Sequence, residues 1–423
     1  MTATDVHRAI EAVWRIESAR LIAALARRVR DVGTAEELAQ DALVSALEQW
    51  PRGGIPDNPG AWLMATAKNR MIDRHRHARM AHDKHLILAH ELEMEQQSDS
   101  DAERAADDPI GDDLLRLIFV ACHPLLSRDS RTALTLRLLG GLTTAEIARA
   151  FLTPEPTIAQ RIVRAKRTLS EAQVPFELPP PAELGGRLAS VLEVIYLIFN
   201  EGYAATAGAD WMRPALCEEA LRIARILAGL APAESEVHGL AALLEIQASR
   251  LRARAAADGT PVLLMDQNRG EWDRLLIHRG LLALARGEAL TASRGPYLLQ
   301  AAIAACHARA ASPAETDWVN ITALYDELAQ LTGSPVVELN RAVAVSMAYG
   351  PAAGLAITDE LVSGGVLAAY HLLPSVRGEL LQRLGRFGEA RGQFELAAEL
   401  THNARERALL TARAAACLKH VAS

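Results

Sequence analysis

The side chains with the most evident chemistry in this sequence are arginines and lysines at helical spacing. The stretch "TAEIARAFLTPEPTIAQRIVRAKRTL" at 144–169 gathers them most densely. Guanidinium and ammonium groups along one side of a helix bind phosphates. The nucleotide-binding, zinc-protease and hydrolase patterns GxGxxG, GxxxxGK[ST], HExxH and GxSxG do not occur. These residues therefore predict nucleic-acid binding and no bond-making chemistry.

Two other clusters suggest different chemistry. A loose group of histidines could indicate a metal site: His75, His77, His82, His85 and His90. Their spacing is irregular and no cysteine lies near, which is atypical of a metal site. The acids of "DQNRGEWD" (266–273) could form a carboxylate site, but such clusters more often cap helices and hold an arginine in a buried network. We therefore predict no metal, no cofactor and no enzyme.

The stretch at 144–169 predicts a helix-turn-helix. Thr143 or Thr144 can cap the first helix, with Glu146 in its first turn. "LTPEPT" breaks the pattern, and we expect Thr153 to cap the second helix with Pro154 at its first position. The predicted buried stripe of the second helix is Ile158, Ile162, Ala165 and Leu169. Its other face carries Thr157, Gln160, Arg161, Arg164, Lys166 and Arg167.

A helix with an anchored apolar stripe and a cationic outer face fits the major groove of DNA. Its earlier polar residues would reach base edges, and its later cations would grip phosphates. The alternative is an amphipathic helix whose basic face is simply solvated.

Two further helices are predicted near the N-terminus. Segment 35–50, "AEELAQDALVSALEQW", has an apolar face and an acidic one, which is either solvated or docks on a basic partner helix. The acidic, polar face comprises Glu36, Glu37, Gln40, Asp41 and Glu48. Segment 61–79, "AWLMATAKNRMIDRHRHAR", has an aromatic residue at its start and is crowded with cations. That combination suits single-stranded or melting DNA, because cations pair with phosphates and exposed bases need flat or polar contacts.

Composition bounds the architecture. A chain of 423 residues suggests two to four domains. Its Ala, Leu and Arg content favours helices, so we predict an all-α fold. The net charge of −7 argues against a protein that coats DNA along its whole surface, although local basic patches remain compatible. Four distant cysteines indicate a reducing cytoplasm, and no stretch of about 18 apolar residues predicts a membrane span.

The sequence also predicts where the chain is divided. Residues 91–113 are strongly acidic and read as a linker, and "VPFELPPPAELGG" (174–186) reads as an extended domain boundary that cannot be helical. Beyond it, 374–402 has the spacing of a tetratricopeptide unit: Gly378, Ala390, Phe394 and Ala397. Small residues let two helices approach while the phenylalanine fills the gap to the next pair. A weaker copy at 339–361 uses Ala342 and Gly354, and generic helical hairpins are the alternative.

The sequence resembles an extracytoplasmic-function (ECF) RNA polymerase sigma factor in the order of four features. These are the acidic helix, the segment "NPGAWLMATAKNRMIDRHRH", the linker and the helix-turn-helix. The resemblance covers about 10–170. With the boundaries above it implies the following division: sigma region 2 at 1–80, an acidic linker at 81–111, sigma region 4 at 112–173, a proline-rich boundary at 174–186, and a tetratricopeptide-like domain at 187–423.

The resemblance also implies roles for individual residues. The clamp coiled coil of RNA polymerase core would be contacted by Glu37, Leu38, Gln40, Asp41 and Leu43. The −10 promoter element would be met by Trp62, Lys68, Asn69, Arg70, Asp73 and Arg76. The −35 element would be met by Thr157, Gln160, Arg161 and Arg164, with Lys166 and Arg167 beside them. An acidic linker would then either mimic nucleic acid in the polymerase channels or keep the modules off DNA without polymerase.

The segment after 186 resembles the extension carried by a sigma-factor group with a tetratricopeptide-like tail. Four segments carry this resemblance: 196–206, 266–277, 295–308 and 334–345. It loosely implies a small YCII-like protein as partner. Two other interpretations stay open: a non-sigma helix-turn-helix regulator with a helical-repeat sensor, and a tail that stands in for a separate anti-sigma protein. A plain regulator has no need of the acidic and basic helices within 35–79.

Overall fold

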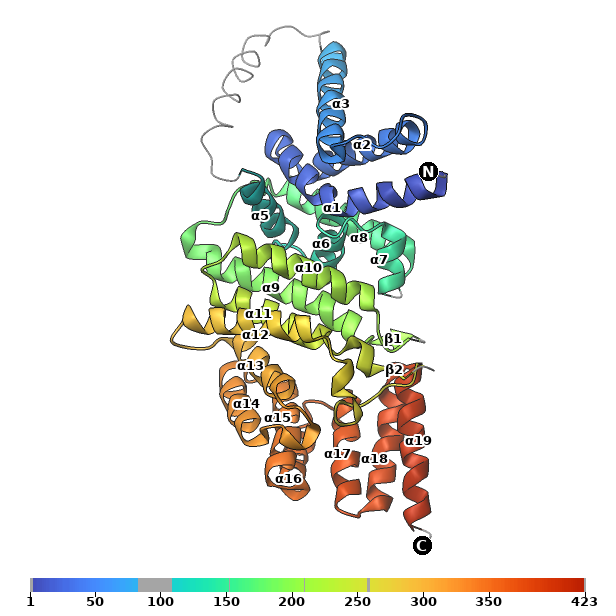
Figure 1. Cartoon of the computed structure of the whole chain (residues 1–423), viewed down its shortest axis with the longest axis vertical. Coiled ribbons are helices and arrows are strands. Elements are labelled where there is room, and N and C mark those ends of the chain that lie inside the picture. Colours follow the sequence, from blue (N-terminus) through green and yellow to red (C-terminus); the bar gives the residue numbers. More distant parts are fainter. Residues whose placement is uncertain (1–2, 83–108, 152, 209, 257–258, 422–423) are drawn as a thin grey trace. The chain divides into compact units, whose positions relative to one another are not determined.

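The computed structural model describes residues 3–82, 109–151, 153–208, 210–256 and 259–421. Within these ranges the chain is built of helices (Figure 1), which confirms the predicted all-α class. Its extended structure there amounts to a two-residue parallel pair, β1 (Ala207–Gly208) and β2 (His402–Asn403), and one isolated bridge. The chain forms two compact units, Met1–Val194 and Ile195–Ser423. The predicted acidic linker lies mostly outside the described residues.

The first unit consists of short helical hairpins. Its helices are α1 (Ala3–Val29), α2 (Val32–Gly53), α3 (Pro59–His82), α5 (Pro109–Ala121), α6 (Arg128–Leu138), α7 (Thr144–Ala150), α8 (Glu155–Glu171) and the first part of α9 (Pro181–Tyr203). Asp31 caps α2 by accepting a hydrogen bond from the Thr34 backbone nitrogen at 2.6 Å. Gly54 ends the helix at a positive φ of 84° that favours glycine.

Helices α7 and α8 form the predicted helix-turn-helix. Thr143 and Glu146 make a reciprocal capping box at the start of α7, as expected from their spacing. The predicted buried stripe of α8 is confirmed, since its four members are all buried. The predicted start of α8 is wrong by one residue: Pro154 takes the cap position, and the Thr153 hydroxyl donates instead to the Phe151 carbonyl at 3.2 Å.

The proline-rich segment is partly helical, which corrects the expectation that 174–186 cannot be. Helix α9 begins at Pro181, the last of the three consecutive prolines. Proline is well accommodated in a first helical turn, because its fixed φ suits the helix and its missing N–H has no partner there. The division between the two compact units then falls inside α9, after Val194.

The first half of α9 is anchored on the helices of region 4. The Arg131 guanidinium of α6 bonds to Ser190 and reaches the Glu193 carboxylate at 3.4 Å. The Ser190 hydroxyl donates onward to the Cys122 carbonyl at 2.8 Å. Arg187 donates to the Phe119 carbonyl at 3.2 Å. One continuous helix therefore begins in the first compact unit and ends in the second.

The second unit is a series of helical hairpins. Its helices are the rest of α9, α10 (Pro214–Leu230), α11 (Ser235–Ala248), α12 (Arg274–Ala289), α13 (Pro296–Arg309), α14 (Trp318–Thr332), α15 (Pro335–Tyr349), α16 (Pro351–Gly364), α17 (Leu372–Arg383), α18 (Phe387–Leu400) and α19 (Ala404–Val421). Short 3₁₀ turns lie at Leu251–Arg254, Leu264–Asp266, Arg269–Glu271 and Pro313–Glu315.

Glycines mark the closest helix crossings of this unit. A Cβ on Gly378 would lie 2.7 Å from the Phe394 ring, and one on Gly354 would lie 2.6 Å from the Ala342 carbonyl. The repeat spacing predicted small residues at positions 342, 354 and 378, but it expected Phe394 to fill the gap to the next helix pair. The stretch "NEGY" at 200–203 predicts a helix-ending turn with unusual backbone angles at Gly202, but Gly202 does not adopt a positive φ. It sits where a Cβ would lie 2.7 Å from the Cys217 backbone nitrogen, so it permits close packing.

The acidic segment 266–273 is structural, as the sequence favoured. Asp273 caps α12 by accepting hydrogen bonds from two backbone amides at 2.9 and 3.1 Å. Arg269 is buried and donates to the carbonyls of His307 and Ala310 and to the Thr316 hydroxyl, at 2.7–2.9 Å. The cluster therefore organises a loop and offers no open carboxylate site.

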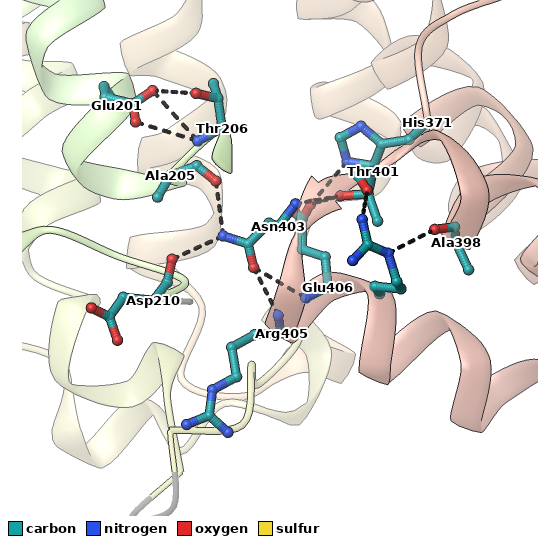
Figure 2. Close-up of polar contacts among 11 residues, drawn as sticks. Glu201, Ala205, Thr206, Asp210, His371, Ala398, Thr401, Asn403, Arg405 and Glu406 are labelled. Carbon is teal, nitrogen blue, oxygen red and sulfur yellow. Dashed lines mark hydrogen bonds and ion pairs between the residues drawn. The ribbon is translucent and has the colours of Figure 1, made fainter. Parts of the chain in front are cut away.

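A buried asparagine joins the start of the tail to its end (Figure 2). Asn403 is 0% exposed, and its amide nitrogen donates to the carbonyls of Ala205 and Asp210 at 3.1 and 2.8 Å. Its amide oxygen accepts from the backbone nitrogens of Arg405 and Glu406 at 3.0 and 3.2 Å. The same side chain therefore caps α19 and links segments 198 residues apart.

Replacing Asn403 by Ala should destabilise this junction by about 3–5 kcal/mol, because two buried carbonyls lose their donor and α19 loses its cap. We expect a lower unfolding temperature and faster hydrogen exchange at the amides of 404–406. His402→Ala, at the exposed neighbouring position, is the matched control. Unchanged exchange in Asn403→Ala would contradict the assignment.

Candidate nucleic-acid interface

The outer face of α8 is a polar and cationic surface. Thr157, Gln160, Arg164 and Arg167 are exposed along it, while the buried stripe holds the helix on α6 and α7. Arg167 forms an i,i+4 ion pair with Glu171 at 2.9 Å. Both side chains of that pair are largely exposed, so water screens it and phosphate can replace the carboxylate. The face has the composition that a major groove accepts.

Two of the predicted α8 cations are held by the protein itself. Arg161 is about one-third exposed and pairs with Asp129 of α6 at 2.9 Å. Lys166 points away from the outer face and forms an ion pair with Glu36 of α2. Lys166 is therefore paired with a protein carboxylate, and it does not lie on the exposed face of α8 with Arg164 and Arg167.

Glu36 is the central group of that contact. The sequence placed it on the solvated acidic face of α2, but it is 2% exposed, which is a correction. The Arg137 guanidinium of α6 donates to its carboxylate at 2.6 Å, and Lys166 and Gln40 contact it as well. A buried carboxylate needs such partners, because desolvating an unpaired charge is very costly.

Other ion pairs join region 2 to region 4 in the same unit. Arg27 of α1 reaches Asp113 of α5 at 3.5 Å, and Arg15 of α1 reaches Glu146 of α7 at 3.3 Å. The second of these pairs is exposed and weak. The buried contacts at Glu36 and Asp113 therefore dominate the electrostatics of this junction.

The outward face of α2 differs from the predicted one by a rotation about the helix axis. Glu37, Asp41, Val44 and Glu48 are exposed at helical spacing, and Val44 is 51% exposed although it is apolar. Gln40 and Leu43 are half-buried. Leu38 was predicted to contact a partner, but it is only 1% exposed and packs in the core of the unit. The apolar periodicity carried this information, because Leu38 belongs to the same stripe as Ala42.

Helix α3 carries the second cationic surface. Asn69, Arg70, Asp73 and Arg76 are exposed along it, and Lys68 is half-buried. Trp62 is half-buried and meets the buried Trp50 edge-to-face, with ring centroids 5.3 Å apart. The sequence reasoning missed Trp50, which fixes the Trp62 ring at the start of the cationic helix.

Contacts between α3 and α2 connect this surface to the acidic face. Arg74 pairs with Glu37 at 2.9 Å, and Arg70 donates to the Ser45 hydroxyl at 3.4 Å. Both arginines are exposed, so these contacts hold the side chains without burying them. Side chains of the histidine cluster at 75–90 lie outside the described residues. Among the described residues no group of three or more His, Cys, Asp or Glu could hold a metal ion.

Comparisons with known proteins assign the two cationic modules. Residues 16–80 match Sigma-70 region 2, and residues 116–169 match Sigma-70 region 4. The ECF RNA polymerase sigma factor SigC of Mycobacterium tuberculosis is 30% identical over 35% of this chain and 75% of its own length. SigK of Mycobacterium ulcerans, with the same description, is 32% identical over 36% of this chain and 78% of its own length.

The chain belongs to the ECF RNA polymerase sigma factors.

One further family model and two further relatives match this sigma factor. Residues 187–288 match a family of unknown function, DUF6596. An uncharacterized protein of Rhizobium meliloti is 44% identical over 92% of this chain and 90% of its own length. The probable ECF sigma factor SigI of M. tuberculosis is 28% identical, and the match spans 59% of its length. No solved structure matches the chain. In the described part of the sigma factor, every helix is too short or too polar to cross a bilayer.

Replacing Glu36 by Gln should loosen region 4 from region 2. The change leaves Arg137 and Lys166 without a carboxylate in a buried site, and breaking a buried pair costs about 3–5 kcal/mol. We expect lower energy transfer between dyes placed on Glu48→Cys and Thr168→Cys. The native thiols should not label, because burial raises the pKa of Cys122 to about 11 and that of Cys217 to about 12.

The matched control is Glu171→Gln, which removes an exposed ion-pair partner of α8. Its energy transfer should equal that of the unmodified chain. Equal transfer in Glu36→Gln would show that this carboxylate does not hold the two regions together.

Proposed function

We propose that this sigma factor docks on RNA polymerase core through the outward face of α2 and reads promoter DNA with α3 and α8. The observation that carries the proposal is the match of the two cationic modules to Sigma-70 regions 2 and 4, with both cationic faces exposed. It performs no bond chemistry. Its work is to place polymerase on a promoter and to stabilise strand opening.

The docking surface in this proposal is Glu37, Asp41, Val44 and Glu48. Three carboxylates around an exposed apolar side chain suit a basic partner helix that also offers apolar contact. Gln40 and Leu43 lie at its edge. Leu38 acts by holding α2 in the core and not by touching polymerase.

The −10 element is assigned to α3. Arg70 and Arg76 would pair with phosphates, and Asn69 and the Trp62 ring would meet unstacked bases. Support comes from the edge-to-face contact with Trp50, which fixes the Trp62 ring where the helix begins. Lys68 and Asp73 lie on the same helix and would set the local charge.

The −35 element is assigned to the outer face of α8. Thr157, Gln160 and Arg161 lie in its first half and would reach base edges, whereas Arg164 and Arg167 would grip phosphates. Lys166 becomes available to DNA only after it leaves Glu36. Arg161 would likewise exchange Asp129 for a base or phosphate.

The packed arrangement of regions 2 and 4 cannot reach both promoter elements. Their names place them about 25 base pairs apart, which is about 85 Å along straight B-DNA. In the structure Arg74 of α3 touches Glu37, and the adjacent Glu36 touches Lys166 of α8. A path from Asn69 to Thr157 runs along α3, through these two side-chain contacts and along α8. Its total length is less than about 50 Å. We propose that docking on polymerase separates α2 from α8.

The tail is proposed to regulate this separation through α9. That helix is anchored on region 4 by the Arg131 contacts and continues into the second unit. A change in the tail can therefore bias region 4 without a separate anti-sigma protein. A small YCII-like protein is the candidate partner of the tail, and copurification with the full chain tests it.

Run-off transcription with purified core polymerase tests the promoter roles. Arg161→Ala and Arg70→Ala should each reduce promoter-dependent transcripts about fivefold or more, since each removes a contact worth about 1–3 kcal/mol. Arg164→Ala should weaken binding across sequences and lower the salt slope by about one. Arg391→Ala, in an exposed tail ion pair, is the control. Full transcription from a Glu37→Lys, Asp41→Lys double variant would contradict docking through α2 and favour a non-sigma regulator.

The α9 coupling has its own test. Arg131→Met removes the contacts to Ser190 and Glu193 but leaves the tail sequence intact. We expect the transcript yield to change about fivefold or more, because typical coupling energies of about 1–3 kcal/mol correspond to changes of that size. Arg128→Met is the control, because Arg128 pairs with the same Glu193 from an exposed position. Equal yields from both variants, with unchanged unfolding temperatures, would contradict the coupling.

A further inference from the structure

The tail contains an internal cavity that promoter recognition does not use. It has a volume of about 260 Å³ and lies wholly in the second unit, among α9, α11, α13, α14 and α15. Ligand pockets usually measure roughly 300–1,000 Å³, so this cavity suits a small metabolite. The motifs at 196–206, 295–308 and 334–345 all contribute to its lining.

One wall of the cavity is aromatic. Phe199 and Tyr203 lie stacked, with ring centroids 5.5 Å apart, and Tyr196 and Tyr325 also line the space. Burial raises the pKa of Tyr325 to about 12, so its hydroxyl is a donor at neutral pH. The Tyr203 hydroxyl donates to Gln247 at 2.9 Å. The Arg254 guanidinium lies over the Tyr203 ring, 3.3 Å from its centroid, so a planar ligand would meet the apolar edges of these rings and not an open face of Tyr203.

The charge of the lining is positive and lacks a counter-charge. Arg250 is the cation, and its guanidinium donates to the amide oxygens of Gln267 and Gln247 at 3.1 and 3.0 Å. The residues that line the cavity include no acid. A guanidinium held by neutral amides keeps affinity for an anion.

His307 adds a second polar group without adding charge. It is 8% exposed, and its Nδ1 has no hydrogen-bond partner among the described residues. Burial, and then the nearby Arg250 and Arg269, lower the pKa of His307 to about 4. The ring is therefore neutral from pH 5 to 8, and it can exchange a hydrogen bond with a ligand across that range.

We propose that this cavity binds a small planar organic monoanion, with its carboxylate on Arg250 and its flat body against the aromatic wall. One guanidinium neutralises one carboxylate, whereas a phosphate dianion calls for more donors than the lining provides. The site goes beyond promoter recognition, since it gives the tail a chemical signal to detect. Any effect of the ligand on transcription rests on the proposed coupling through α9, which supplies the aromatic wall.

Calorimetric titration of the full chain tests the site. The probes are benzoate, 4-hydroxybenzoate and cinnamate, the uncharged amide of each, and inorganic phosphate. We expect at least one carboxylate to bind saturably, and its amide to bind at least about tenfold more weakly. Arg250→Gln should weaken carboxylate binding by a similar factor. Arg294→Gln, which removes an exposed guanidinium elsewhere in the tail, should leave it unchanged.

A second variant tests whether binding needs the volume of the cavity, without changing its charge. Ala304→Leu adds three carbon atoms to a buried lining residue and should abolish binding while circular dichroism stays unchanged. Saturable binding by none of the carboxylates, equal affinity for acid and amide, preference for phosphate, or full affinity in Arg250→Gln would each overturn the proposal. A carboxylate that binds but leaves run-off transcription unchanged contradicts the α9 coupling alone.

Discussion

The buried carboxylate of Glu36 is the interaction on which the arrangement of the promoter-binding unit depends. It is desolvated between Arg137 and Lys166, so it is stable only while α6 and α8 lie against α2. Such a pair contributes little net stability compared with apolar packing, but separating its members is costly unless water or another charge replaces them. DNA phosphates can replace Glu36 as partners of Lys166, and water can hydrate the carboxylate once α8 leaves. The contact therefore suits a junction that must open.

The positions and pairing of its charges explain how an acidic protein can bind DNA. Cations on α3 and α8 act within about a Debye length, so a net charge of −7 does not prevent local phosphate binding. Several of these cations have carboxylate partners in the free protein: Arg74 with Glu37, and Arg167 with Glu171. Exposed pairs of this kind are weak and exchange readily for phosphate. The acids thus shield the DNA-binding cations without blocking them.

In the proposed regulation, helix α9 links the tail to promoter recognition. Its first half is hydrogen-bonded to region 4 and its second half forms the aromatic wall of a tail cavity. A rigid helix transmits a displacement over its length, whereas an extended proline segment would absorb it. The start of α9 at Pro181 places the last of three prolines in the first helical turn, so the chain between the two units is helical and not an extended proline segment.

The sequence alone predicted a threonine cap for α7 and the buried stripe of α8, because each depends on neighbours within a few residues. Tertiary structure decided what depends on distant partners. The burial of Glu36 and the inward turn of Lys166 follow from contacts between residues about 100 or more positions apart. Local pattern places a charge on a helix face, but only the packed chain determines whether that face meets water.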